Sequence, residues 1–200
     1  MPTAVLRPLL ALAALAVSGT LPAAVQAQEA VRIESATFEP HVLMVGHKLR
    51  LNGAGLNGSN KGNAAGLYLV KWARSTAEAL EAPGPRRLQI RFIEPQEGKA
   101  FGAALSGALR ANVPAQELPD CLPGLLRLGE LLATRKTLAA GDDLNLDFIP
   151  GQGTFVDVKG QRIGQIDSKP FYGCLLRAYL GDKPMDGSLK TALLAAGKTK

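Results

Sequence analysis

The chain has 200 residues, of which 46% are hydrophobic and 20% are charged. This balance supports one domain with a sizeable core and excludes a chain that is disordered throughout. The formal net charge is +6, but the basic residues are scattered and do not alternate with aromatic side chains, so nucleic-acid binding is not expected.

The first 27 residues have the pattern of a secretory signal peptide. Arg7 is their one charged residue, residues 9–17 form an apolar run, and residues 25–27 form a small-x-small cleavage site that ends at Ala27. The alternative is a buried N-terminal helix. We expect cleavage near Ala27, a mature domain of residues 28–200, and a periplasmic or secreted location. No later segment is long enough to span a bilayer.

The mature chain contains two cysteines, Cys121 and Cys174. In an oxidising compartment they can form one disulfide. The alternative is that both are small apolar core residues on helices. Their spacing does not match a metal site, and we expect neither a metal nor another cofactor.

A glycine-dense stretch, residues 51–69, dominates the first half of the chain. Glycine at this density indicates unusual backbone angles or the close approach of another part of the chain, and we expect any pocket to lie beside it. Alternation and turn residues predict strands around it and a short helix with Ser75 as its cap. The expected strands are residues 31–34, 42–45, 48–51, 64–70 and 88–92, and the expected helix is residues 75–80.

The second half of the chain begins with apolar residues at three- and four-residue spacing, which predicts amphipathic helices over residues 97–113 and 117–132. Three strands then form an expected antiparallel meander, at residues 144–149, 154–158 and 162–166. Ser168 is expected to cap a helix over residues 169–180, and a last helix covers residues 188–196. This order predicts an α+β domain with a mainly antiparallel sheet and helices on one face.

Five segments together resemble the chalcone isomerase-like proteins, and in particular their bacterial, exported branch. These segments are residues 51–56, 66–69, 111–113, 147–154 and 176–184. The resemblance covers nearly the whole mature chain. It implies an open-faced β-sandwich, in which a large antiparallel sheet and a helical layer enclose a cleft.

Plant members of this family close a chalcone to a flavanone, and an arginine after a glycine-rich motif is central to that reaction. Another branch binds fatty acids and uses the same arginine to hold the carboxylate. A guanidinium suits both roles because it is planar and permanently charged. Here the matching residue is Asn57, whose neutral amide can polarise a carbonyl but cannot neutralise a buried carboxylate.

The resemblance places three further family positions on this chain. The threonine of the plant enzymes falls on Asn63, the catalytic tyrosine falls on Leu105, and the asparagine that follows it falls on Asn112. Of the four positions, only Asn112 keeps the family residue, so no catalytic residue is assigned. The candidate ligand-binding residues are Asn57, Asn63, Tyr68, Phe101, Leu105 and Asn112.

We therefore expect an exported, non-catalytic protein that binds a neutral or weakly polar hydrophobic small molecule or lipid, with a fatty acid as the alternative partner. Its cleft would lie between the sheet and the helices of residues 97–132. The alternatives are an intramolecular lyase or isomerase of unknown substrate and a structural accessory protein of the cell envelope. Lys61, Arg91 or Arg110 pointing into the cleft would restore a cation for an anionic ligand. The oligomeric state stays open.

Overall fold

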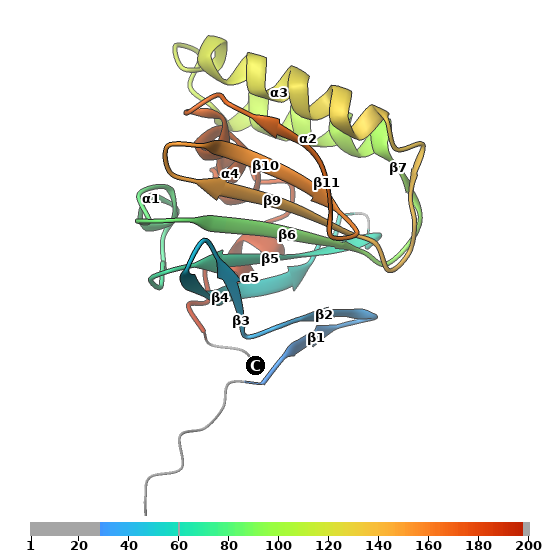
Figure 1. Ribbon diagram of the computed structural model, residues 1–200, viewed down its shortest axis with the longest axis vertical. Coiled ribbons are helices and arrows are strands. Elements are labelled where there is room, and N and C mark those ends of the chain that lie inside the picture. The colour runs from blue at the N-terminus through green and yellow to red at the C-terminus, as the bar shows by residue number, and fades with distance from the viewer. Residues whose placement is uncertain (1–28, 60, 198–200) are drawn as a thin grey trace, which may run out of the picture.

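The computed structural model describes residues 29–59 and 61–197. The expected signal peptide, residues 1–27, lies outside the described residues. The described chain forms one curled sheet of seven strands with helices against it (Figure 1). This arrangement confirms the predicted α+β class and the open-faced sandwich.

The large sheet is antiparallel throughout and has the strand order β11-β10-β9-β6-β5-β4-β3. The three strands that come last in the chain, β9 to β11, are the predicted meander. The strands are β3 (His41–Met44), β4 (His47–Leu56), β5 (Asn63–Leu69), β6 (Arg86–Phe92), β9 (Asp143–Ile149), β10 (Gly153–Val158) and β11 (Gln161–Ile166).

The helices pack on one face of this sheet, where their apolar side chains and those of the central strands form the main core. They are α1 (Thr76–Leu80), α2 (Gly98–Asn112), α3 (Leu118–Ala133), α4 (Phe171–Leu180) and α5 (Gly187–Leu193). The short strand β7 (Gln96–Glu97) precedes α2, and it pairs with the short strand β8 (Thr137–Leu138), which follows α3.

A second, smaller core lies on the other face of the sheet. There the hairpin of β1 (Val31–Ile33) and β2 (Ala36–Phe38) covers β3, β4 and β5. Phe38 and Tyr68 are fully buried in this core. Because side chains alternate across a strand, Tyr68 faces the hairpin while its neighbours Leu67 and Leu69 face the helices.

The glycine-dense stretch is explained by close approach rather than by unusual backbone angles. A Cβ on Gly53 would overlap the carbonyl oxygen of Ala192 in α5, and a Cβ on Gly55 would lie 2.6 Å from the Ala192 Cβ. A Cβ on Gly66 would lie 2.6 Å from the Phe38 ring. The glycines of β4 therefore allow α5 to lie directly on the strand backbone.

Three local expectations from the sequence were wrong. Strand β4 continues through the glycines to Leu56, and β2 was not expected at all. Ser168 does not cap α4, which begins at Phe171 after Pro170; the Ser168 hydroxyl instead donates to the carbonyl of Asp120. By contrast, Ser75 caps α1 as predicted, because its hydroxyl accepts from the Glu78 N–H.

Cys121 of α3 and Cys174 of α4 form a disulfide, with their Cα atoms 6.1 Å apart. Of the two alternatives for the cysteines, the structure shows the bridge, and both residues are also buried in the main core. The bridge ties α3 to α4, which lie 53 residues apart in sequence at this point.

We predict that Gly53→Ala lowers the free energy of unfolding by about 1–3 kcal/mol, because the added methyl group forces α5 away from β4. Gly107→Ala is the matched control: Gly107 is exposed within α2 and has no atom within 4 Å of its added Cβ, so the same change should stabilise the helix by about 0.5–1 kcal/mol. Urea unfolding measures both. Equal stability of Gly53→Ala and the parent protein would contradict direct helix-on-strand packing.

Candidate functional site

Asn57, which the sequence resemblance predicts to occupy the position of the family arginine, lies where β4 ends and belongs to a chain of three side-chain amides. Its Nδ2 donates to Asn63 Oδ1 at 3.4 Å, and Asn63 Nδ2 donates to Gln96 Oε1 at 3.3 Å. The backbone holds the pair in place, because Asn57 N–H donates to the Asn63 carbonyl at 2.9 Å. Asn57 and Asn63 are both buried, and Gln96 carries the chain outward to the surface.

A groove of about 300 Å³ begins at the outer end of this amide chain. Phe101 forms part of its wall and packs edge-on against Phe92 of the sheet, with ring centroids 5.3 Å apart. The groove thus joins a polar amide to an apolar surface. Its lining residues are Gln96, Glu97, Ala100, Phe101, Ala104 and Met185.

This groove is shallower than the cleft expected between the sheet and the helices. Phe92, Phe101 and Leu105 fill the space under α2 and are between 0% and 4% exposed. A ligand would therefore lie against the start of α2, beside the loop between α4 and α5 that carries Met185, and not beneath the helix.

None of the three cations considered in place of the family arginine lines the groove. Lys61 is exposed in the turn after β4, and Arg110 is exposed on α2. Arg91 pairs with Asp143 in the sheet and alternates with Phe92, so it faces away from the helices. Glu97 is the charged residue in the lining, and the groove can offer hydrogen bonds to a neutral group but no positive charge.

Of the six candidate residues only Phe101 lines the groove, and Asn57 and Asn63 reach it through Gln96. Leu105 is fully buried in the main core, and Tyr68 lies in the second core on the opposite face of the sheet. The Asn112 amide is already engaged: Nδ2 donates to the carbonyls of Ala108 and Lys183 at 2.8 and 2.6 Å, and Oδ1 accepts from the Lys183 N–H at 2.7 Å. Asn112 therefore fastens α2 to the loop between α4 and α5.

Sequence reasoning missed Gln96 and Met185, which complete the groove. Gln96 lies in a two-residue strand, and Met185 lies in a loop nearly 90 residues later, so neither belongs to a periodic pattern. Only the fold brings them beside Phe101.

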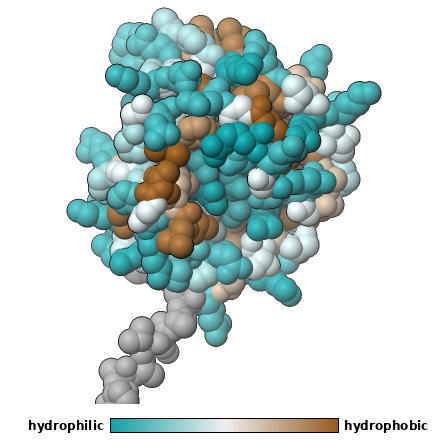
Figure 2. Space-filling view, in the orientation of Figure 1, coloured by the Kyte–Doolittle hydropathy of each residue, from teal (hydrophilic) through white to brown (hydrophobic). Residues whose placement is uncertain are grey.

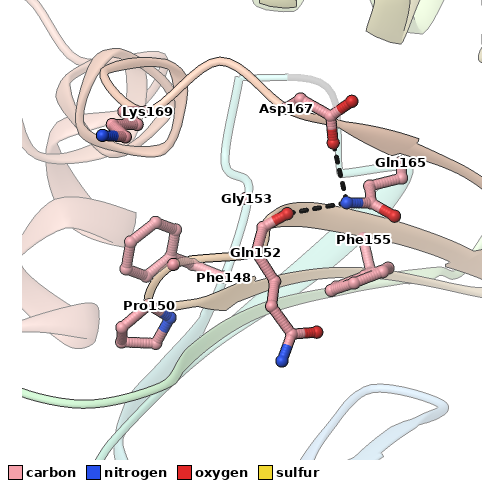
Figure 3. A pocket seen from close by; sticks show the side chains of 9 residues that line it. Phe148, Pro150, Gln152, Gly153, Phe155, Gln165, Asp167 and Lys169 are labelled. Atoms are coloured by element: carbon pink, nitrogen blue, oxygen red, sulfur yellow. Dashed lines mark hydrogen bonds between the residues drawn. The ribbon is translucent and has the colours of Figure 1, made fainter.

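A second, larger hollow of about 610 Å³ lies at the turn between β9 and β10, within the family-like segment 147–154. Figure 3 shows Phe148 and Phe155 on the two sides of this turn and Lys169 beyond them. Gln165 Nε2 donates to the Gln152 carbonyl and to Asp167 Oδ1, both at 2.7 Å. This hollow was not expected. A hollow of about 540 Å³ does lie beside the glycine-dense stretch, as expected, and is lined by Asn52, Gly53 and Ala54 of β4 together with Ala192 of α5.

Several titratable groups that lie outside the groove have pKa values shifted by burial. It raises the pKa of Tyr68 and Tyr172 and lowers the pKa of Arg86. The Arg86 guanidinium donates to the Leu80 carbonyl at 2.7 Å, and its carbon lies 4.6 Å from the Phe148 ring centroid. These groups lie in the second core or beside α4, so they are not positioned to transfer protons in the groove.

Among residues 29–59 and 61–197, no cluster of three or more His, Cys, Asp or Glu side chains could hold a metal ion. Within the same residues, no helix is both long and apolar enough to cross a membrane.

We predict that Asn112→Ala lowers the free energy of unfolding by about 1–3 kcal/mol, because it leaves the Lys183 N–H and two carbonyls without their partner. Urea unfolding measures the loss. Unchanged stability combined with weaker ligand binding would place Asn112 in the binding site instead.

Comparison with known proteins agrees with this fold. A solved structure of a fatty-acid binding protein from Arabidopsis thaliana has a TM-score of 0.63 and 16% identity, and it covers 84% of this chain and 97% of its own. At that identity the likeness shows a shared fold. No curated protein sequence matches the chain. A sequence model described as chalcone isomerase-like matches residues 30–195. The chain therefore belongs to the chalcone isomerase-like family.

Proposed function

We propose that this protein is an exported, non-catalytic binding protein whose groove takes an uncharged, largely apolar ligand with one polar end. The observation that carries the proposal is the amide chain Asn57–Asn63–Gln96. Its first member, Asn57, is the residue that the sequence resemblance aligns with the family arginine. The polar end of the ligand lies at Gln96, and its apolar part lies along Phe101 and Ala104.

The electrostatics of the groove favour a neutral polar end. A carboxylate that leaves water needs an opposite charge close by, and amides supply only neutral donors. Glu97 in the lining would repel it. The Asn57 Oδ1 is buried without a hydrogen-bond partner among the described residues, so a ligand hydroxyl that reached it would satisfy that acceptor.

The solved relative supports the apolar part of the proposal. It is a fatty-acid binding protein by name, and it shares the fold over most of both chains. The absence of a cation in the groove here argues for a fatty alcohol, an ester or another neutral amphiphile in place of a free acid. Since the groups with shifted pKa values lie elsewhere, binding is better supported than isomerisation.

Two observations support export. Residues 1–27 have the composition of a signal peptide, and the Cys121–Cys174 disulfide is the kind of bridge that persists in an oxidising compartment. We therefore place the working protein in the periplasm or outside the cell.

We predict that Ala104→Trp abolishes binding of a neutral amphiphile such as a long-chain fatty alcohol, because the indole fills the groove. Ala103→Trp is the matched control, since Ala103 is an equally exposed alanine of α2 that does not line the groove. Displacement of an environment-sensitive fluorescent probe measures binding. Equal affinity in the two variants would refute the assignment of the groove.

We predict that Asn57→Arg raises the affinity for a long-chain fatty acid relative to the matching alcohol by about tenfold, because a charged hydrogen bond replaces a neutral one. Calorimetric titration of both ligands gives the ratio, and a thermal melt verifies that the variant folds. Lys169→Gln is the comparison, because Lys169 is the cation of the larger hollow. If the parent protein binds the acid and Lys169→Gln loses it, anion binding belongs to that hollow and the proposal fails.

A further inference from the structure

The hairpin between β3 and β4 ends in an apolar tip that the rest of the described fold leaves uncovered. Leu43 is 81% exposed and Val45 is 56% exposed. The space-filling view shows brown, hydrophobic atoms gathered on the left of this face, over the region where β3 and β4 lie in Figure 1 (Figure 2). The neighbouring Met44 and Leu49 turn inward to the second core, so Leu43 and Val45 contribute little to packing.

The turn itself holds Val45 outward in an unfavourable conformation. Val45 and Gly46 both have positive φ, at 43° and 79°, and they join the paired residues Met44 and His47. Such two-residue turns favour Asn-Gly, because a β-branched side chain fits the left-handed region poorly. The folded protein thus carries an exposed valine where asparagine would fit better, and no packing contact accounts for it.

The surface around this tip is basic. Residues 40–77 contain no Asp or Glu, and their five Lys and Arg residues are Lys48, Arg50, Lys61, Lys71 and Arg74. Lys48 and Arg50 are exposed on β4. Strand β5 runs antiparallel to β4 and pairs Leu69 with Arg50, so the chain after it brings Lys71 and Trp72 to the tip end of the sheet.

An aromatic ring and two acidic residues border this basic segment. The Arg50 guanidinium carbon lies 5.8 Å from the centroid of the half-buried Trp72 ring. The bounding acidic residues are Glu39, which precedes β3, and Glu78, whose carboxylate accepts from the Arg74 backbone N–H at 2.6 Å. The hairpin tip therefore combines two outward apolar side chains with the cations Lys48, Arg50 and Lys71, none of which forms an ion pair with an acidic side chain of the described residues.

We propose that the β3–β4 hairpin docks this protein on an anionic lipid surface, with Leu43 and Val45 in the interface and Lys48, Arg50 and Lys71 against the headgroups. Two apolar side chains bury far less area than a stable protein–protein contact needs. They match shallow insertion into a bilayer, where a short apolar element and a basic surface act together and the association is reversible. This inference goes beyond the proposed groove ligand and does not depend on it.

Co-sedimentation with phospholipid vesicles tests the proposal, using the purified protein with the same N-terminus in every variant. The parent protein should bind vesicles of phosphatidylcholine with one-third phosphatidylglycerol and bind pure phosphatidylcholine far more weakly. Binding should fall as salt rises. Trp72 is the single tryptophan of the chain and lies beside the basic surface, so its fluorescence is a second readout.

Three variants and one control separate the contributions. Leu43→Ser with Val45→Asn should lower partitioning at least tenfold, while Val45→Asn alone should keep or raise the melting temperature, since asparagine suits positive φ. Lys48→Gln with Lys71→Gln should cost about fivefold for each cation removed. Leu126→Ser is the matched control, because Leu126 is 66% exposed on α3, away from the hairpin, and the substitution should leave binding unchanged.

Three outcomes would overturn the proposal. One is no binding to anionic vesicles, and another is equal loss in the Leu126→Ser control. The third is a concentration-dependent dimer that the Leu43 and Val45 substitutions dissolve while vesicle binding stays the same, which would make the tip a contact between two copies of this chain.

Discussion

The direct contact of α5 with the backbone of β4 determines much of the rest of this structure. It is possible because Gly53 and Gly55 present no side chain to Ala192. The Asn52 amide reinforces it by donating to the carbonyls of Ala73 and Leu193, at 2.8 and 2.7 Å. A larger side chain at either glycine would lift the helix from the sheet.

The groove depends on that contact through the residues that precede α5. Asp186 caps the helix by accepting from the Leu189 N–H, and the Ser59 hydroxyl lies 3.1 Å from the same carboxylate and 3.0 Å from the Met185 carbonyl. The turn after β4 and the start of α5 are thereby joined. This junction brings Met185 to the groove that Gln96 and Phe101 form from the other side.

The two faces of the sheet serve different purposes. The helical face holds the main core, the disulfide and the amide chain, and the opposite face holds the second core under the β1–β2 hairpin. Farther along that opposite face, Arg87 and Asp147 form a two-bond ion pair with both distances at 2.6 Å. The pair is largely buried, so its two bonds offset the cost of taking both charges out of water, and it joins residues that lie directly opposite each other on β6 and β9.

The sequence by itself determined the antiparallel meander and the two long helices, which it predicts over residues 97–113 and 117–132 and which the structure has at residues 98–112 and 118–133. These follow from periodicity and turn chemistry, which act over a few residues. For the glycine-dense stretch the sequence offered unusual backbone angles or close approach, and the structure decided for close approach. The family resemblance also predicts that Asn57 stands at the position of the family arginine. Only the tertiary structure decided that Asn57 joins Asn63 and Gln96, that Tyr68 faces away from the helices, and that the groove is shallow. Those facts depend on which face each strand turns to a neighbour and on contacts across up to 90 residues, and no local pattern encodes them.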